Sequence, residues 1–270
     1  MGVLPMLEKI FGTRKPVIGV VHLLPLPGSH NPTPMQKVIT RAIRDAVAYK
    51  RGGVDGIIIE NFGDTPYRER VGPETVAAMT LVVSEVSSHV DIPIGINVLR
   101  NDGISAMAIA TVTGASFIRV NVLIGAYVTE QGIISGIAPD LLRYKRFLGS
   151  DVKIFADVHV KHATPLWAQP IGDAAREIVM RAHPDAIIVT GRRTGDPPPI
   201  EHIMEVKSHI GEGTPIIVGS GVDHWNIGDF MRIADGVIVG TSVKVNNVTT
   251  NPVDEERVKK LVEEAQKYRE

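Results

Sequence analysis

Residues 214–244 read TPIIVGSGVDHWNIGDFMRIADGVIVGTSVK and contain one repeating unit of the fold. Two apolar runs, PIIV from Pro215 and GVIV from Gly236, flank a segment at 225–233 with a helical pattern. Runs that are apolar on both faces are typical of parallel strands covered by helices on each side of the sheet. A glycine-rich turn follows each run, so the stretch predicts strand, turn, helix, strand and turn.

The same unit recurs along the whole chain. Short β-branched runs begin near Val17, Gly56, Pro93, Phe117, Lys153, Ala186, Pro215 and Gly236. Helices are predicted between and after them at 36–51, 74–90, 104–113, 139–148, 172–182, 200–209, 225–233 and 252–268, the last capped by Asn251. Eight such units fit a (β/α)8 barrel or a doubly wound sheet, and the length of 270 residues favours the α/β barrel. No linker divides the chain, so we expect one barrel domain over residues 1–270.

Composition excludes several classes of function. The chain has no cysteine, which rules out disulfides, thiolate metal sites and a cysteine nucleophile. It carries 29 Lys and Arg against 30 Asp and Glu, a net charge of −1, and has no basic run, so we expect no nucleic-acid partner. No apolar segment reaches the roughly 18 uninterrupted residues of a membrane span, and the N-terminus does not resemble a signal peptide. We therefore expect a cytoplasmic protein without membrane insertion.

Polar residues gather at the predicted carboxyl ends of the first five strands, where barrel enzymes place their chemistry. On the fifth run, Asp157, His159 and Lys161 are spaced two residues apart, so they are expected on one face of the strand. One polar residue fits an ordinary barrel rim, but three ionisable groups on one interior face are costly without a use. The candidate catalytic residues are His22, Glu60, Asp157 and Lys161, and the candidate substrate-binding residues are Asn61, Asn97, Arg119, Asn121 and His159.

The glycine-rich turns after the last two runs form a second signal. Barrels often bind phosphate with these two loops through backbone N–H groups, although such turns also occur without any ligand. A segment at 190–199 with paired arginines fits a lid over an anionic substrate, or a solvated loop. The expected phosphate-binding residues are Gly219, Ser220, Gly221, Gly240, Thr241 and Ser242, with Lys244 as a nearby positive charge or a plain surface lysine.

Several longer motifs resemble the BtpA-type family. They include GVVHLLPLPGS at 19–29, VDGIIIENFGDTPY at 54–67, ADVHVKHA at 156–163 and GTSVKVNNVTTNPVD at 240–254. The resemblance runs from about Lys15 to the C-terminus and implies a TIM barrel related to the ribulose-phosphate-binding barrels. The family is named for a role in photosystem I biogenesis, and other members are described as predicted TIM-barrel enzymes. The matching motif residues are His22, Pro25, Pro27, Gly28, Glu60, Asn61, Asp64, Asn97, Arg119, Asn121, Asp157, Lys161, His162, Gly195 and Lys244.

Three functional hypotheses follow from these residues. The leading one is an enzyme that acts on a small phosphorylated metabolite by general acid and base chemistry at the barrel mouth, without a cofactor. Its class is isomerase, lyase or hydrolase, and Lys161 could instead form a Schiff base. The second is metal-assisted hydrolysis, with a divalent metal on His22, Asp157 and His159. The third is a non-enzymatic assembly factor for a membrane complex. A homo-oligomer is compatible with each of them.

Overall fold

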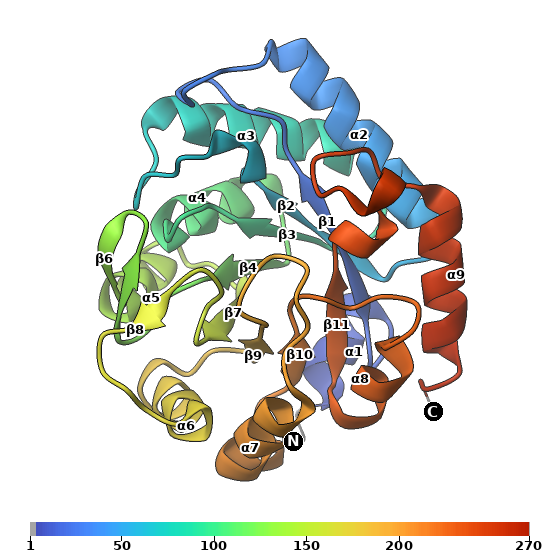
Figure 1. Cartoon of the computed structure of the whole chain (residues 1–270). Coiled ribbons are helices and arrows are strands. Elements are labelled where there is room, and N and C mark those ends of the chain that lie inside the picture. The colour runs from blue at the N-terminus through green and yellow to red at the C-terminus, as the bar shows by residue number, and fades with distance from the viewer. Residues whose placement is uncertain (1–3, 270) are drawn as a thin grey trace.

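The computed structural model describes residues 4–269, and within them eight parallel strands close into a barrel (Figure 1). Around the ring, β1 pairs with β2 on one side and with β11 on the other, which closes the sheet. Each of the eight strands lies within a predicted apolar run, so the barrel prediction is confirmed. The strands are β1 (Val17–His22), β2 (Gly56–Glu60), β3 (Ile94–Asn97), β4 (Phe117–Val120), β7 (Lys153–Val158), β9 (Ala186–Val189), β10 (Ile216–Val218) and β11 (Gly236–Val239).

A helix follows each barrel strand and covers the outside of the sheet (Figure 1). These helices are α2 (Met35–Arg51), α3 (Pro73–Ser87), α4 (Gly103–Thr113), α5 (Ala138–Phe147), α6 (Ile171–Ala182), α7 (Ile200–Ile210), α8 (Ile227–Ile233) and α9 (Glu255–Gln266). The predicted start of the last helix is wrong. Asp254 caps α9 by accepting hydrogen bonds from the backbone of Glu256 and Arg257. The chain before it is held extended, because Val253 pairs with Lys244 and donates its N–H to Asp45.

An additional helix, α1 (Leu4–Phe11), closes the amino-terminal end of the barrel. Leu7 and Phe11 reach the barrel interior, where the Phe11 ring meets Phe117 at a centroid distance of 5.6 Å. Phe117 in turn stacks on Phe155 at 4.6 Å. This apolar layer fills the barrel at the amino-terminal ends of the strands, so the barrel interior accommodates polar side chains toward the carboxyl ends.

A small antiparallel sheet lies beside the barrel mouth in the order β6-β5-β8 (Figure 1). Its strands are β5 (Ala126–Thr129), β6 (Gly132–Ser135) and β8 (Thr164–Pro165), and they come from the segments after β4 and β7. Tyr127 and Ile134 of this sheet pack on Val122 and Val160. The remaining elements are short 3-10 turns at Phe62–Asp64, Gly211–Gly213, Thr241–Val243 and Val245–Asn247. Across residues 4–269, no helix has the length and apolar character that crossing a membrane requires.

Candidate functional site

A cavity of about 500 Å³ opens at the carboxyl end of the barrel, and we call it the mouth cavity. It brings together ten of the predicted site residues from both sequence signals. Those that line it are His22, Glu60, Arg119, Lys161, Gly219, Ser220, Gly221, Gly240, Thr241 and Ser242. The predicted residues that do not line it are Asn61, Asn97, Asn121, Asp157, His159 and Lys244.

Asp157 is bound to Arg119 beneath the mouth cavity. Arg119 donates from Nε and Nη2 to the two carboxylate oxygens of Asp157, each at 3.0 Å. Asn121 donates to the same carboxylate at 3.0 Å, and Asn97 donates to the Asn121 amide oxygen at 3.1 Å. Both partners of the ion pair are only 2% exposed. This geometry favours a positioning role for Asp157, which orients Arg119, over the catalytic role predicted from the sequence.

Glu60 and His22 face the cavity from neighbouring strands. The Glu60 Oε1 atom lies 3.7 Å from His22 Nε2, and the Glu60 carboxylate accepts no hydrogen bond from any residue in the described part of the chain. Burial and the positive charges of Lys244 and Lys161 lower the pKa of His22 well below 6.5. The imidazole is therefore neutral at pH 7, and no hydrogen-bond donor within residues 4–269 binds the Glu60 side chain beside it.

Lys161 enters the cavity from beyond the end of β7. Burial, with the nearby charge of Arg119, lowers the pKa of its ammonium to about 8. The Lys161 side chain makes no hydrogen bond or ion pair within residues 4–269, while its carbonyl accepts from Arg100 at 2.5 Å. A lysine with a pKa close to neutral exists as both amine and ammonium near pH 8, so it can take up or release a proton.

The prediction that Asp157, His159 and Lys161 share one strand face is wrong. β7 ends at Val158, and His159 has a φ of +46°, so the two-residue alternation stops there. The His159 ring packs edge-on against Tyr127 of β5 at a centroid distance of 6.3 Å. Asn61 is likewise used structurally, because its amide accepts from Leu99 N–H at 2.7 Å and donates to Asp64 at 3.1 Å.

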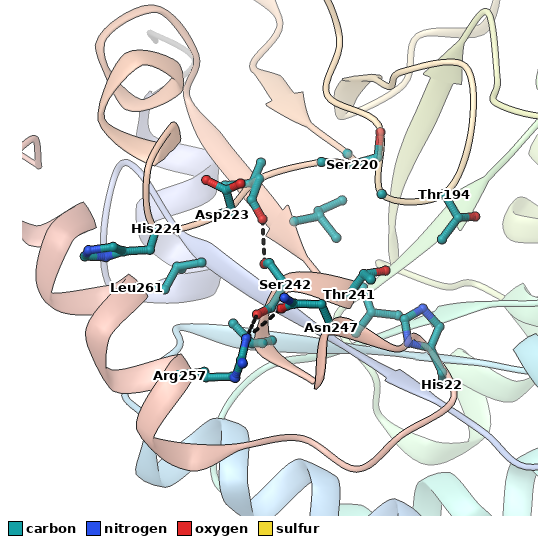
Figure 2. A pocket seen from close by; sticks show the side chains of 18 of the residues that line it. His22, Thr194, Ser220, Asp223, His224, Thr241, Ser242, Asn247, Arg257 and Leu261 are labelled. Carbon is teal, nitrogen blue, oxygen red and sulfur yellow. Dashed lines mark hydrogen bonds between the residues drawn. The ribbon is translucent and has the colours of Figure 1, made fainter. Parts of the chain in front are cut away.

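The two glycine-rich turns line the cavity and, within residues 4–269, carry backbone N–H groups without a hydrogen-bond acceptor. Among the described residues, the N–H groups of Gly221, Val222, Thr241 and Ser242 have no protein acceptor. The hydroxyl groups are used to connect the loops: Ser242 donates to the Val222 carbonyl at 2.6 Å (Figure 2). Ser220 donates to the Asp196 carbonyl at 2.8 Å and accepts from Gly191. Backbone N–H groups rather than serine hydroxyls are thus free for an anion.

Gly221 is required by the packing of its turn. Its φ is +68°, and a Cβ atom there would lie 2.0 Å from the Pro197 nitrogen. Any larger residue would displace the 190–199 segment together with the turn. A variant at 221 therefore cannot separate anion binding from loop structure, and the test of an anion site must use other residues.

Lys244 is not the cation of the cavity. It is fully buried with Nζ 3.5 Å from Asp45, under the Tyr49 ring. The backbone leaves the Thr241–Val243 turn and pairs at Lys244 with Val253, which directs this side chain toward α2. Two cations of α9, Arg257 and Lys260, line the cavity instead.

Arg257 lies beside the second glycine-rich turn (Figure 2). Its Nη1 donates to the Ser242 carbonyl at 3.3 Å and to the Asn247 amide oxygen at 2.6 Å. Lys260 and the buried Leu261 follow Arg257 by three and four residues on α9, so the three residues share one helix face. This spacing is the sequence signal that points to the two cations. No group of three or more His, Asp or Glu side chains within residues 4–269 is arranged to hold a metal ion, and that includes His22, Asp157 and His159.

The lowered pKa of Lys161 gives a direct prediction. Acylation requires the free amine, and the amine fraction rises as the pH passes through the pKa. We expect the labelling rate of Lys161 with acetic anhydride, followed by mass spectrometry, to be half-maximal near pH 8. For a lysine with an ordinary pKa, the labelling rate is half-maximal at about pH 10.4. A Lys161 midpoint above pH 10 would contradict the described environment of this side chain.

Comparison with known proteins places this site in a family. The BtpA family model matches residues 13–267. The protein named "Photosystem I biogenesis protein BtpA" from Synechocystis is 49% identical over 259 residues, which cover 95% of this chain and 90% of that protein. These matches extend over the barrel strands and both glycine-rich turns.

Solved structures of TIM-barrel enzymes share the fold of this chain at low sequence identity. N-(5'-phosphoribosyl)anthranilate isomerase from Pyrococcus furiosus superposes with a TM-score of 0.56 and 13% identity, covering 94% of this chain and 99% of that one. Thiamine phosphate pyrophosphorylase from the same organism gives 0.58 and 10%, covering 94% and 96%. At these identities the likeness shows the fold alone. The family match and the close relative together show that the chain belongs to the BtpA family.

Proposed function

We propose that the protein is an enzyme that acts on a small phosphorylated metabolite at the barrel mouth. The observation that carries the proposal is that a single cavity joins two sets of groups. One set is the free N–H groups of the glycine-rich turns with Arg257, and the other is Glu60, Lys161 and neutral His22. An anchor for a non-reacting phosphate next to proton-transfer groups is a common arrangement in barrel enzymes.

The anchor would hold the phosphate by charge-assisted hydrogen bonds. Backbone donors at Gly221 and Ser242 are fixed by the loop-to-loop bond from Ser242 to Val222, so they need little reorganisation on binding. Arg257 supplies a charge and is held in place by the Ser242 carbonyl and Asn247. The phosphate would fix the remainder of the substrate over the barrel axis.

The reacting end has groups for proton transfer. Glu60 is a carboxylate without a hydrogen-bond donor among residues 4–269, which suits a general base. Lys161, with its pKa lowered to about 8, suits the general acid. Arg119, oriented by Asp157, would stabilise negative charge that develops on a substrate oxygen. Isomerase, lyase and hydrolase chemistry each use such a set.

The proposed class of substrate is one that enzymes of this fold are named for. The phosphoribosylanthranilate isomerase and the thiamine phosphate pyrophosphorylase are both named for a phosphorylated compound. The name of the Synechocystis relative favours a second candidate, a non-catalytic assembly factor for photosystem I. That candidate needs no phosphate anchor and no lysine with a lowered pKa, so the two are separable by ligand binding.

The anchor is tested by thermal shift with inorganic phosphate and sugar phosphates. A ligand at about 100 times its dissociation constant adds about 2.7 kcal/mol of stability, which gives a clear shift. We expect a shift in the wild type that is strongly reduced in Arg257→Ala. The matched control is Arg143→Ala on α5, because within residues 4–269 the Arg143 side chain bonds to its own helix at the Pro139 carbonyl and does not line the mouth cavity. If no ligand shifts the melting temperature, or if both variants lose the shift equally, the result would contradict the phosphate anchor and favour the assembly factor.

A further inference from the structure

We propose that the substrate extends beyond its anchored phosphate and carries a second phosphate and a planar aromatic ring, as in a nucleoside diphosphate ester. The proposal rests on the proposed phosphate anchor and names the class of substrate for it. It starts from the shape of the mouth cavity, which does not stop at the glycine-rich turns. The lining continues past them to His224 and Trp225 before α8 and to Arg257, Lys260 and Leu261 of α9.

We call the part of the cavity on the His22 side of the turns the inner part and the part on the His224 side the outer part. Figure 2 shows His22 and Thr194 on one side of Thr241 and Ser242, and His224 and Arg257 on the other. The inner part holds the proton-transfer groups. A substrate that ended at its phosphate would fill the inner part and the anchor and leave the outer part empty. The outer part therefore indicates a second group attached through the anchored phosphate.

The charge of the outer part fits another phosphate. Arg257 and Lys260 are three residues apart on α9, so they lie on adjacent turns of one helix face. Lys260 is exposed and makes no ion pair with any residue of the described chain, so its ammonium is free for a ligand. The Oδ1 atom of Asp223, which lines this part, accepts from the backbone of Trp225 and Asn226 at 2.8 and 3.0 Å. Arg257 lies 3.7 Å from Asp254, so within residues 4–269 Lys260 is the cation of the outer part that has no carboxylate partner.

An aromatic platform lies at the outer edge. Trp225 is 88% exposed, and the His224 ring meets it edge-on at a centroid distance of 5.1 Å. A large exposed indole that lines the same cavity as two cations suits a nucleotide, because the base can stack on the ring while the cations hold the phosphates. Leu261 is only 1% exposed and gives the floor of this part an apolar surface.

The experiment compares two probes that share one end. ADP-ribose consists of ribose 5-phosphate joined through its phosphate to AMP, so it adds a second phosphate, a second ribose and the adenine base. We expect ADP-ribose to bind wild-type protein at least about tenfold more tightly than ribose 5-phosphate in calorimetric titration, since stacking on one aromatic ring alone is worth about that factor. Trp225→Ala should reduce the affinity for ADP-ribose about tenfold, the share that stacking contributes, and leave the affinity for ribose 5-phosphate unchanged.

The chain contains a matched control for Trp225. Its second tryptophan, Trp167, is 81% exposed next to β8 and does not line the mouth cavity. Trp167→Ala should keep the full preference for ADP-ribose. Both side chains are exposed, so neither variant should lower the melting temperature by more than a few degrees. In the variants Trp167→Phe and Trp225→Phe, we expect ADP-ribose to quench fluorescence only where Trp225 remains.

The outcomes separate this inference from the proposed function. Equal affinity for the two probes, or an unchanged preference in Trp225→Ala, would overturn the extended substrate and leave the phosphate anchor in place. Failure of both probes and of inorganic phosphate to bind would overturn the anchor and this inference together. A preference for ADP-ribose that falls about tenfold in Trp225→Ala and persists in Trp167→Ala is the supporting result.

Discussion

Replacing Asp157 with alanine is expected to lower the free energy of unfolding by about 3–5 kcal/mol. The substitution removes the carboxylate that accepts both bonds from Arg119 and one from Asn121. Arg119 is 2% exposed, so its charge would remain buried without a partner, which is the costly half of a broken buried ion pair. Urea denaturation of the purified variant measures the effect.

A matched surface pair serves as the control for Asp157. Asp173 and Arg176 are joined at 3.1 Å on α6, with side chains 37% and 55% exposed. Asp173→Ala should cost less than about 1 kcal/mol, because solvent screens exposed pairs. If Asp157→Ala cost no more than Asp173→Ala, the buried pair would not organise the barrel mouth as described.

Lys161→Ala is expected to reduce turnover by a factor of about 10² to 10⁴, the usual contribution of a general acid or base. Binding of phosphate should change little, because the anchor lies on the turns after β10 and β11. Lys161→Arg should be equally inactive, because a guanidinium stays protonated and cannot exchange a proton near neutral pH. The measurement is the rate of consumption of a compound that the wild type converts.

The control for Lys161 lies at the other end of the barrel. Lys9 is exposed on α1, which closes the amino-terminal end, and Lys9→Ala should retain wild-type turnover. Turnover by Lys161→Ala at the wild-type rate would remove Lys161 from the mechanism. Loss of both turnover and phosphate binding in this variant would show that Lys161 organises the cavity rather than the proton transfer.

The barrel could be predicted from the sequence because its strands are buried on both faces. Runs such as GIIIE and GVIVG are nearly all apolar, and few structures other than a covered parallel sheet use them. The helix α1 has no such marker, since its role comes from the Phe117 and Phe155 rings that it meets in the folded barrel. The β5–β6–β8 sheet was missed because most residues of its strands are exposed or half-buried, so they do not form an apolar run of the kind that marks the barrel strands.

The strand pattern alone did not decide which predicted residues reach the cavity, because Asp157 lies within β7 and does not line it, whereas Lys161 lies beyond β7 and does. His22 and Glu60 lie within strands β1 and β2, and both reach the cavity as predicted. His159 lies just past a strand end, where its positive φ breaks the alternation. Lys244 was expected as the positive charge near the second glycine-rich turn, but Arg257 lies there instead. Asp45, remote in sequence, binds Lys244, while the return of α9 brings Arg257 to the turn.

Incubation of the wild-type protein with a panel of phosphorylated metabolites and their dephosphorylated counterparts, followed by mass spectrometry, tests the central claim most directly. The panel should contain sugar phosphates and nucleoside diphosphate esters. We expect consumption of one class of phosphorylated compounds and none of the matching dephosphorylated ones, because the phosphate anchors the substrate over Glu60 and Lys161. Consumption of none of the panel, or equal consumption of compounds with and without phosphate, would contradict the account.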